Sequence, residues 1–234
     1  YQDSLQSAPA AAGLLSEVHR RCSVGQPEAL NTIIVIDLGL GNHRSVENKL
    51  KRLGAKCIVS SAVEEIDKAD KLILPGVGSF DAGMGNLHSL GLLSVLNRKV
   101  LDERTPVLGI CLGLQLLTRR SDEGSADGIG WLSSDTRRFS FPDGASQRVP
   151  HMGWNQVRRI RKSRLLENVP DDASFYFVHS YHLDIGHLES AVGVTRYGYD
   201  FPSVVESGHM FGTQFHPEKS HDAGVVVLRN FLEV

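Results

Sequence analysis

The chain has little of several features that mark specialised classes of protein. Its 234 residues include three cysteines, Cys22, Cys57 and Cys111, with no Cys-x-x-Cys spacing. This set excludes a disulfide framework and a thiolate zinc site, and it favours a reducing, cytoplasmic setting. No apolar run approaches the length of a transmembrane helix. Lys and Arg total 25 against 27 Asp and Glu, so we expect no nucleic-acid or membrane partner.

Signatures for phosphate and metal binding are also missing. Neither G-x-G-x-x-G nor G-K-[ST] occurs at a strand-to-helix junction, which excludes a typical dinucleotide or phosphate loop. His216, Glu218 and His221 do not have the H-E-x-x-H spacing of a metal-binding helix. We therefore expect no metal and no cofactor.

The composition predicts a flexible N-terminal tail at 1–31 and a single domain at 32–234. The tail has no long apolar core, and Asp3 and Glu17 argue against a secretory or transit peptide. No linker-like stretch divides the remaining chain, whose hydrophobic content of 41% is that of an ordinary globular domain.

Apolar runs and helical patterns alternate along the first half of the domain. Strands are expected at 32–37, 55–59, 71–74 and up to Cys111, and helices at 43–53, 64–69, 84–103 and 112–120. This alternation predicts an α/β fold with a flavodoxin-like, doubly wound, mostly parallel sheet, whose functional groups lie beyond the carboxyl ends of the strands. Shorter alternating segments predict an added antiparallel layer. These segments are 131–139, 157–160, 175–182, 191–197 and 203–206, followed by a buried strand at 210–215 and a helix at 225–232.

The strongest chemical signal lies around Cys111. An apolar strand ends at this residue, a helix follows, and Gly109 and Gly113 flank the cysteine two residues away on either side. The pattern is typical of a nucleophile elbow, a strained turn that exposes the nucleophile at the sheet edge. Glycines suit such a turn because it packs closely against neighbouring backbone, and a helix N-terminus favours the thiolate. Taken alone, the pattern also fits a small buried cysteine.

His216 and Glu218 could supply a base and its orienting carboxylate. We expect Pro217 to keep this segment extended, so that the two side chains project to the same side. The carboxylate can then fix the imidazole, which can deprotonate a thiol. Alone, the pair fits an exposed strand end better than a catalytic pair. Together with the cysteine elbow, however, the pair is better explained as a catalytic base and its orienting carboxylate.

A glycine-flanked turn follows the neighbouring strand. The peptide N–H groups of Gly76, Val77 and Gly78, with that of Leu112 after the cysteine, could bind an oxyanion. A plain glycine turn is the alternative. Three further histidines lie in apolar or aromatic sequence and fit hydrogen-bonded structural roles unless the fold brings them to an interface. These are His151, His179 and His182.

Together the motifs resemble the class I (triad) glutamine amidotransferases. The resemblance covers the chain from about Ile33 to its end and is carried by LPGVGSF at 74–80, GICLGLQ at 109–115 and QFHPEKS at 214–220. PHMGWN at 150–155 and YFVHSY at 176–181 are more selective and resemble the glutaminase subunits of imidazole glycerol phosphate synthase. Those subunits work as heterodimers with a (β/α)8-barrel cyclase in histidine biosynthesis.

The resemblance implies that L-glutamine is hydrolysed to glutamate and ammonia through a thioester on Cys111, with His216 as base and Glu218 as its orienter. Ammonia would pass to the cyclase, which forms imidazole glycerol phosphate and AICAR. Matching positions imply substrate binding by Gln115, Ser180 and Tyr181. They imply a partner interface at Asn42, Met152, Gly153, Trp154, Asn155 and Lys219.

Several departures keep other functions open. Leu38 replaces the usual Tyr of the first turn, and Leu114 replaces Met after Cys-Leu-Gly. The segments 128–131 and 137–139 resemble a paralogous branch that supplies ammonia for surface-polysaccharide sugar amidation. Two further alternatives are a catalytically silent regulatory partner and a free-standing cysteine hydrolase of γ-glutamyl substrates. The complete set of Cys111, His216 and Glu218 argues against the first, and the interface-type motif at 150–155 argues against the second.

Overall fold

The computed structural model describes residues 31–41, 43–143, 146–184 and 189–234. The predicted tail therefore lies outside the described residues except for Asn31, and so does Asn42. Residues Asn31–Val234 cluster as one unit. No helix in the described part of the chain is long and apolar enough to cross a membrane.

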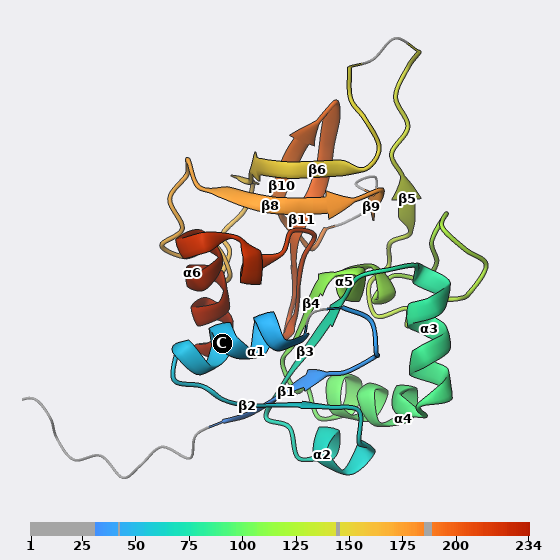
Figure 1. The fold of residues 1–234 in the computed structure, drawn as a ribbon, viewed down its shortest axis with the longest axis vertical. Helices are drawn as coiled ribbons and strands as arrows, with labels where there is room; N and C mark the ends of the chain where they lie inside the picture. The colour runs from blue at the N-terminus through green and yellow to red at the C-terminus, as the bar shows by residue number, and fades with distance from the viewer. Residues whose placement is uncertain (1–30, 42, 144–145, 185–188) are drawn as a thin grey trace, which may run out of the picture. The chain divides into compact units, whose positions relative to one another are not determined.

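A mixed sheet forms the framework of the described residues (Figure 1). Its eight strands run in the order β2-β1-β3-β4-β12-β11-β10-β7. The first five are parallel: β2 (Lys56–Ser60), β1 (Thr32–Ile36), β3 (Lys71–Gly76), β4 (Val107–Cys111) and β12 (Met210–Thr213). The last three continue antiparallel: β11 (Tyr199–Ser207), β10 (Ala191–Tyr197) and β7 (Arg158–Arg159). Because β4 lies between β3 and β12, the turns after these three strands meet at one edge of the sheet.

Helices cover both faces of the parallel strands, so the predicted doubly wound arrangement is confirmed. The alternation of side chains along β1 explains the two layers, because Ile33 and Val35 enter one core and Ile34 and Ile36 the other. The first core takes residues from α1 (His43–Arg52) and α6 (His221–Leu232). The second takes residues from α2 (Val63–Asp67), α3 (Phe80–Ser89), α4 (Leu92–Asn97) and α5 (Leu112–Leu116), and Figure 1 shows α3 and α4 across the sheet from α1 and α6.

The antiparallel part differs in detail from the prediction. Two small sheets stand beside the main one: β5 (Thr136–Arg138) pairs with β9 (Tyr181–Leu183), and β6 (His151–Gln156) pairs with β8 (Ser174–His179). The segment expected to be one strand at 175–182 is thus two strands that pair with different partners on either side of Ser180. The strand at 131–139 is reduced to three residues, and β6 was not predicted.

Two helix predictions were too long. The helical region expected at 84–103 breaks after α3, because Gly91 adopts a left-handed conformation at φ 66° before α4, and a π-helical turn (Arg98–Asp102) follows α4. The helix expected at 112–120 ends at Leu116. There the Thr118 hydroxyl donates a hydrogen bond to the Gln115 carbonyl, and the Thr118 N–H donates to the same oxygen.

Candidate active site

The turn between β4 and α5 has the expected strained geometry. Cys111 has φ 54° and ψ −108°, a left-handed conformation that is rare for a residue other than glycine. Its flanking glycines are sterically required. A Cβ on Gly109 would lie 2.8 Å from the backbone nitrogen and Cα of Leu114, and a Cβ on Gly113 would overlap the carbonyl of Leu74 in β3. The Cys111 side chain is buried, with 6% of the residue exposed.

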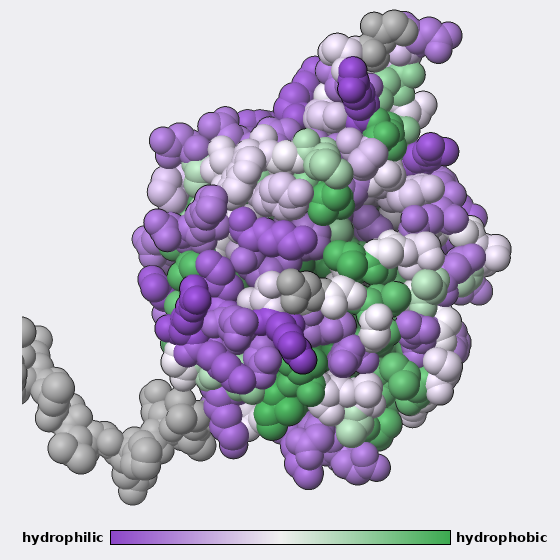
Figure 2. Space-filling model, viewed as in Figure 1, coloured by the Kyte–Doolittle hydropathy of each residue, from purple (hydrophilic) through white to green (hydrophobic). Residues whose placement is uncertain are grey.

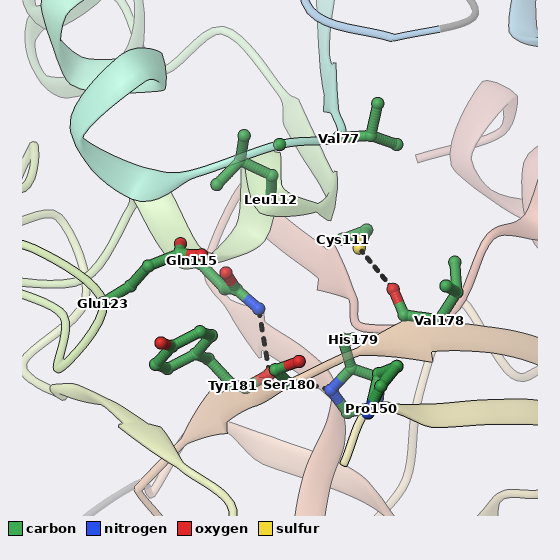
Figure 3. A pocket seen from close by; sticks show the side chains of 11 residues that line it. Val77, Cys111, Leu112, Gln115, Glu123, Pro150, Val178, His179, Ser180 and Tyr181 are labelled. Carbon is green, nitrogen blue, oxygen red and sulfur yellow. Dashed lines mark hydrogen bonds between the residues drawn. The ribbon is translucent and has the colours of Figure 1, made fainter.

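Cys111 lies in the wall of a cavity of about 310 Å³. Figure 3 shows Val77 and Leu112 on one side of it, the segment from Val178 to Tyr181 on the other, and Gln115 between them. The predicted site residues that line the cavity are Val77, Gly78, Cys111, Leu112, Gln115, Ser180 and Tyr181. A cavity of this size accommodates an amino acid.

A second glutamine joins the predicted Gln115 beside the cysteine. The Gln115 side-chain amide donates to the Tyr181 carbonyl at 3.0 Å and to Gln214 Oε1 at 3.2 Å. Gln214 Nε2 in turn lies 3.7 Å from Cys111 Sγ as a hydrogen-bond donor. Gln214 was not among the predicted site residues. The two amides link the cavity wall to the sulfur.

His216 and Glu218 are buried and in direct contact. His216 Nδ1 donates to Glu218 Oε1 at 2.8 Å, with 2% and 8% of the two residues exposed. The prediction of an extended segment is wrong, however, because Pro217–Lys219 forms a short 3-10 helix that begins with Pro217. Proline fits this position, since its fixed φ suits the first turn and its missing N–H has no partner to lose there. The predicted contact between the two side chains is present, but a helical turn rather than an extended segment brings them together.

Charge at the Cys111 sulfur governs the state of the His216 ring. Burial lowers the pKa of His216, but the interactions with Cys111 and then with Glu218 outweigh it and raise the pKa to about 10. Among the described residues His216 Nε2 has no hydrogen bond of ordinary geometry, so the interaction with the sulfur is chiefly one of charge. The raised pKa favours the imidazolium form of His216 beside the sulfur.

We expect the His216 ring to remain protonated at pH 8 and to lose its proton near pH 10. Side-chain nitrogen NMR of the free chain measures this directly. Cys111→Ala and Glu218→Gln should each lower the pKa of His216, because each removes a charge that stabilises the imidazolium while the burial remains. An unchanged midpoint in Cys111→Ala would contradict the ion pair.

The residues expected to bind an oxyanion lie beside the cysteine. Gly76 in β3 is the register partner of Cys111, and Gly78 has φ 111°, a conformation that favours glycine. Leu112 packs against this turn, since a Cβ on Gly76 would lie 3.2 Å from the Leu112 Cβ. Val77 is half-exposed at the cavity, so the turn is open to solvent on one side.

Most of the residues expected at a partner interface share one exposed surface. Met152 and Trp154 project from the outer face of β6 and are 62% and 48% exposed. The Trp154 indole stacks on His221 at 4.7 Å, and Lys219 Nζ lies 5.7 Å from the centre of the Tyr176 ring. We call Met152, Trp154, Tyr176, Lys219 and His221 the aromatic face. Figure 2 shows mainly polar side chains with several separate hydrophobic patches on the face that it draws.

Gly153 and Asn155 alternate with these side chains along β6. Gly153 has φ 128°, a conformation that glycine allows, and Asn155 points inward, where its side-chain amide contacts His151 and the Arg196 carbonyl. Asn155 is therefore turned toward the interior rather than toward the aromatic face.

Four cavity residues were not among the predicted site residues: Glu123, Pro150, Val178 and His179. Glu123 is the most informative, because it places a carboxylate at the cavity. Its Oε2 accepts from the Phe80 N–H at 2.7 Å, and burial raises its pKa. It lies in an irregular segment after α5, where no periodic pattern or motif could have marked it.

The comparisons with known proteins agree with this geometry. Residues 34–234 match the model of the family "Glutamine amidotransferase class-I". The chain is 46% identical to the imidazole glycerol phosphate synthase subunit HisH 2 of Pseudomonas aeruginosa, over 86% of this chain and 99% of that protein. It is 44% identical to the subunit of the same name from Methanococcus maripaludis, over 86% and 98%. A solved glutamine amidotransferase shares the fold with a TM-score of 0.65 at 22% identity, over 86% and 97% of the two chains. The chain belongs to the class-I glutamine amidotransferase family.

Proposed function

We propose that the chain is the glutaminase subunit of imidazole glycerol phosphate synthase and that it supplies ammonia to a cyclase subunit. The observation that carries the proposal is the identity of 44–46% to two HisH subunits along almost their whole length. The cysteine elbow, the buried His–Glu pair and the cavity support the same activity from the geometry.

In the first half of the reaction, the Cys111 thiolate attacks the side-chain carbonyl carbon of glutamine. The oxyanion that forms is stabilised by the peptide N–H groups around Val77 and by that of Leu112. The His216 imidazolium donates its Nε2 proton to the amide nitrogen, and the C–N bond breaks to give ammonia and a γ-glutamyl thioester. Glu218 holds the ring in the required orientation throughout.

In the second half, the neutral His216 ring takes a proton from water, and the resulting hydroxide adds to the thioester carbonyl. The C–S bond then breaks and glutamate leaves, with the proton of its new carboxyl group lost to solvent. The Cys111 thiolate and the His216 imidazolium are restored together. The cycle thus begins with His216 as an imidazolium, the form that the raised pKa of His216 favours at rest.

The cavity supplies groups that suit the α-ammonium and α-carboxylate end of glutamine. The Glu123 carboxylate carries the charge that an α-ammonium group requires, and Ser180 and Tyr181 offer polar atoms along the opposite wall. Gln115, held by the Tyr181 carbonyl and by Gln214, borders the path between that end and the sulfur.

The partner is a (β/α)8-barrel cyclase that forms a heterodimer with this chain. The aromatic face supplies Met152, Trp154 and Tyr176, which are residue types enriched at protein interfaces. For ammonia to pass to the cyclase without loss to solvent, the cyclase must cover the turn at Val77, which is open to solvent on one side. The buried free thiols of Cys57 and Cys111 are compatible with a cytoplasmic location.

The decisive experiment is complementation of a histidine auxotroph that lacks this subunit but retains the cyclase. We expect growth without histidine when the chain is expressed, and none with Cys111→Ala at low ammonium. Failure of the wild-type chain to restore growth, with glutaminase activity intact, would overturn the histidine-pathway acceptor and leave the sugar-amidation alternative.

A further inference from the structure

Two buried histidines join the partner-facing strand to the glutamine cavity. His151 in β6 and His179 in β8 are register partners in the small antiparallel sheet, and their rings are hydrogen bonded at 3.0 Å between His151 Nδ1 and His179 Nε2. At one end, His151 Nε2 contacts the Asn155 side-chain amide at 3.2 Å. At the other, His179 Nδ1 contacts the Tyr181 carbonyl at 2.7 Å. His179 itself lines the cavity.

The chemistry of the ends fixes the direction of every bond in this series. A carbonyl oxygen only accepts, so His179 Nδ1 carries a proton and its Nε2 accepts from His151 Nδ1. His151 Nε2 must then accept from Asn155 Nδ2, which also donates to the Arg196 carbonyl. Each ring therefore donates once and accepts once, which a neutral imidazole does.

The surroundings keep both rings neutral. His151 stacks between Phe177, at 4.8 Å, and Tyr197, at 4.0 Å. Burial lowers the pKa of His151 to about 4 and lowers the pKa of His179 well below its ordinary value. A proton on either ring would convert an acceptor into a second donor and break the series.

The series continues from the Tyr181 carbonyl to the sulfur. That oxygen also accepts from Gln115 Nε2, and Gln115 is linked through Gln214 to Cys111. The position of the Tyr181 carbonyl oxygen therefore sets the position of the Gln115 amide. Along β6, His151 and Asn155 face inward while Met152 and Trp154 face outward on the aromatic face.

We propose that His151 and His179 are positioning residues, which hold the Tyr181 carbonyl and the Gln115 amide in register for glutamine and couple their placement to the seating of β6 on its partner. The positioning part depends only on the cavity. The coupling part rests on the proposed function, because it requires the cyclase.

The test compares three variants. His151→Phe keeps the ring stacking but removes both hydrogen bonds, and His151→Asn restores a donor near the place of Nδ1. His182→Phe is the matched control, since His182 is also buried against Phe139 but bonds only to the Leu183 carbonyl and the Tyr199 hydroxyl. The probe is a γ-glutamyl chloromethyl ketone, which binds as glutamine does and alkylates Cys111.

In the isolated chain we expect His151→Phe to raise the ketone concentration that gives half-maximal alkylation by about three- to tenfold, a change comparable to the net free energy of one hydrogen bond. His151→Asn should recover part of this loss, and His182→Phe should match wild type. The positioning role would be overturned if His151→Phe and wild type reached half-maximal alkylation at the same ketone concentration. It would also be overturned if His182→Phe raised that concentration as much as His151→Phe does.

In the complex with the cyclase we expect His151→Phe to bind the partner within about threefold of wild type, yet to lose most of the partner-dependent rise in glutaminase kcat/KM. Full stimulation, or loss of binding itself, would overturn the coupling. Failure of the wild-type chain to complement a histidine auxotroph would instead count against the proposed function and leave the alkylation results standing.

Discussion

Replacing Cys111 by alanine will lower glutamine-dependent formation of imidazole glycerol phosphate by at least about 10⁴-fold, since loss of a nucleophile removes the covalent route altogether. The same complex will keep its activity with added ammonium salt, because the cyclase needs ammonia and not the thioester. Initial rates with each nitrogen source measure both effects.

Cys57→Ala is the matched control for that experiment. Cys57 is also a buried free thiol, but it lies in β2 with its sulfur 3.7 Å from the Glu47 carbonyl, away from the cavity lining. We expect its glutamine-dependent rate to equal that of wild type. Loss of both the glutamine and the ammonium activities in Cys111→Ala would contradict ammonia delivery, because the cyclase would then depend on more than ammonia.

Gly113→Ala will have the largest effect on stability. Its Cβ overlaps the Leu74 carbonyl, and that oxygen belongs to the central strand β3, which cannot move aside without disturbing the sheet. We expect a loss of about 3 kcal/mol in the free energy of unfolding, as for severe overpacking, and a Tm lower by roughly 10 °C. Glutaminase activity will fall as well, because the turn that holds Cys111 is displaced.

The control for this substitution is Gly85→Ala in α3. No atom lies within 4 Å of a Cβ at Gly85, and alanine is the better helix former by about 0.5–1 kcal/mol. Thermal unfolding should therefore show an unchanged or slightly raised Tm for Gly85→Ala. A Gly113→Ala variant as stable as wild type would mean that the elbow does not depend on contact with β3.

The parallel half of the fold could be predicted because its signals are local. A continuous β-branched run marks β1, a short apolar run marks β3, and glycine marks the end of α1. The antiparallel half could not be predicted as well. The segment of β6 reads HMGWNQ, which contains a glycine and no β-branched residue, and its strand character comes from pairing with the distant strand β8.

The site residues divide in the same way, into those marked by a local sequence pattern and those brought together only by the fold. The cysteine elbow and the His–Glu pair are each encoded within a few residues, so their spacing marked them as candidates, and only their combination favoured a catalytic site. Glu123 reaches the cavity from an irregular segment and has no local pattern. Gln214 belongs to the QFHPEKS motif, but its contacts with Gln115 and with the Cys111 sulfur arise only in the folded chain. His151 and His179 were interpreted as structural histidines. Only their pairing across two strands shows that they connect β6 to the wall of the cavity.

The stacking of Trp154 on His221 has a practical consequence. The chain has two tryptophans, and Trp131 is held elsewhere by a hydrogen bond to Asn97. Trp154 is half-exposed, so a partner that covers the aromatic face strips water from its indole and shifts its fluorescence emission to shorter wavelength. In a Trp131→Phe background, that emission follows docking in real time without any added label.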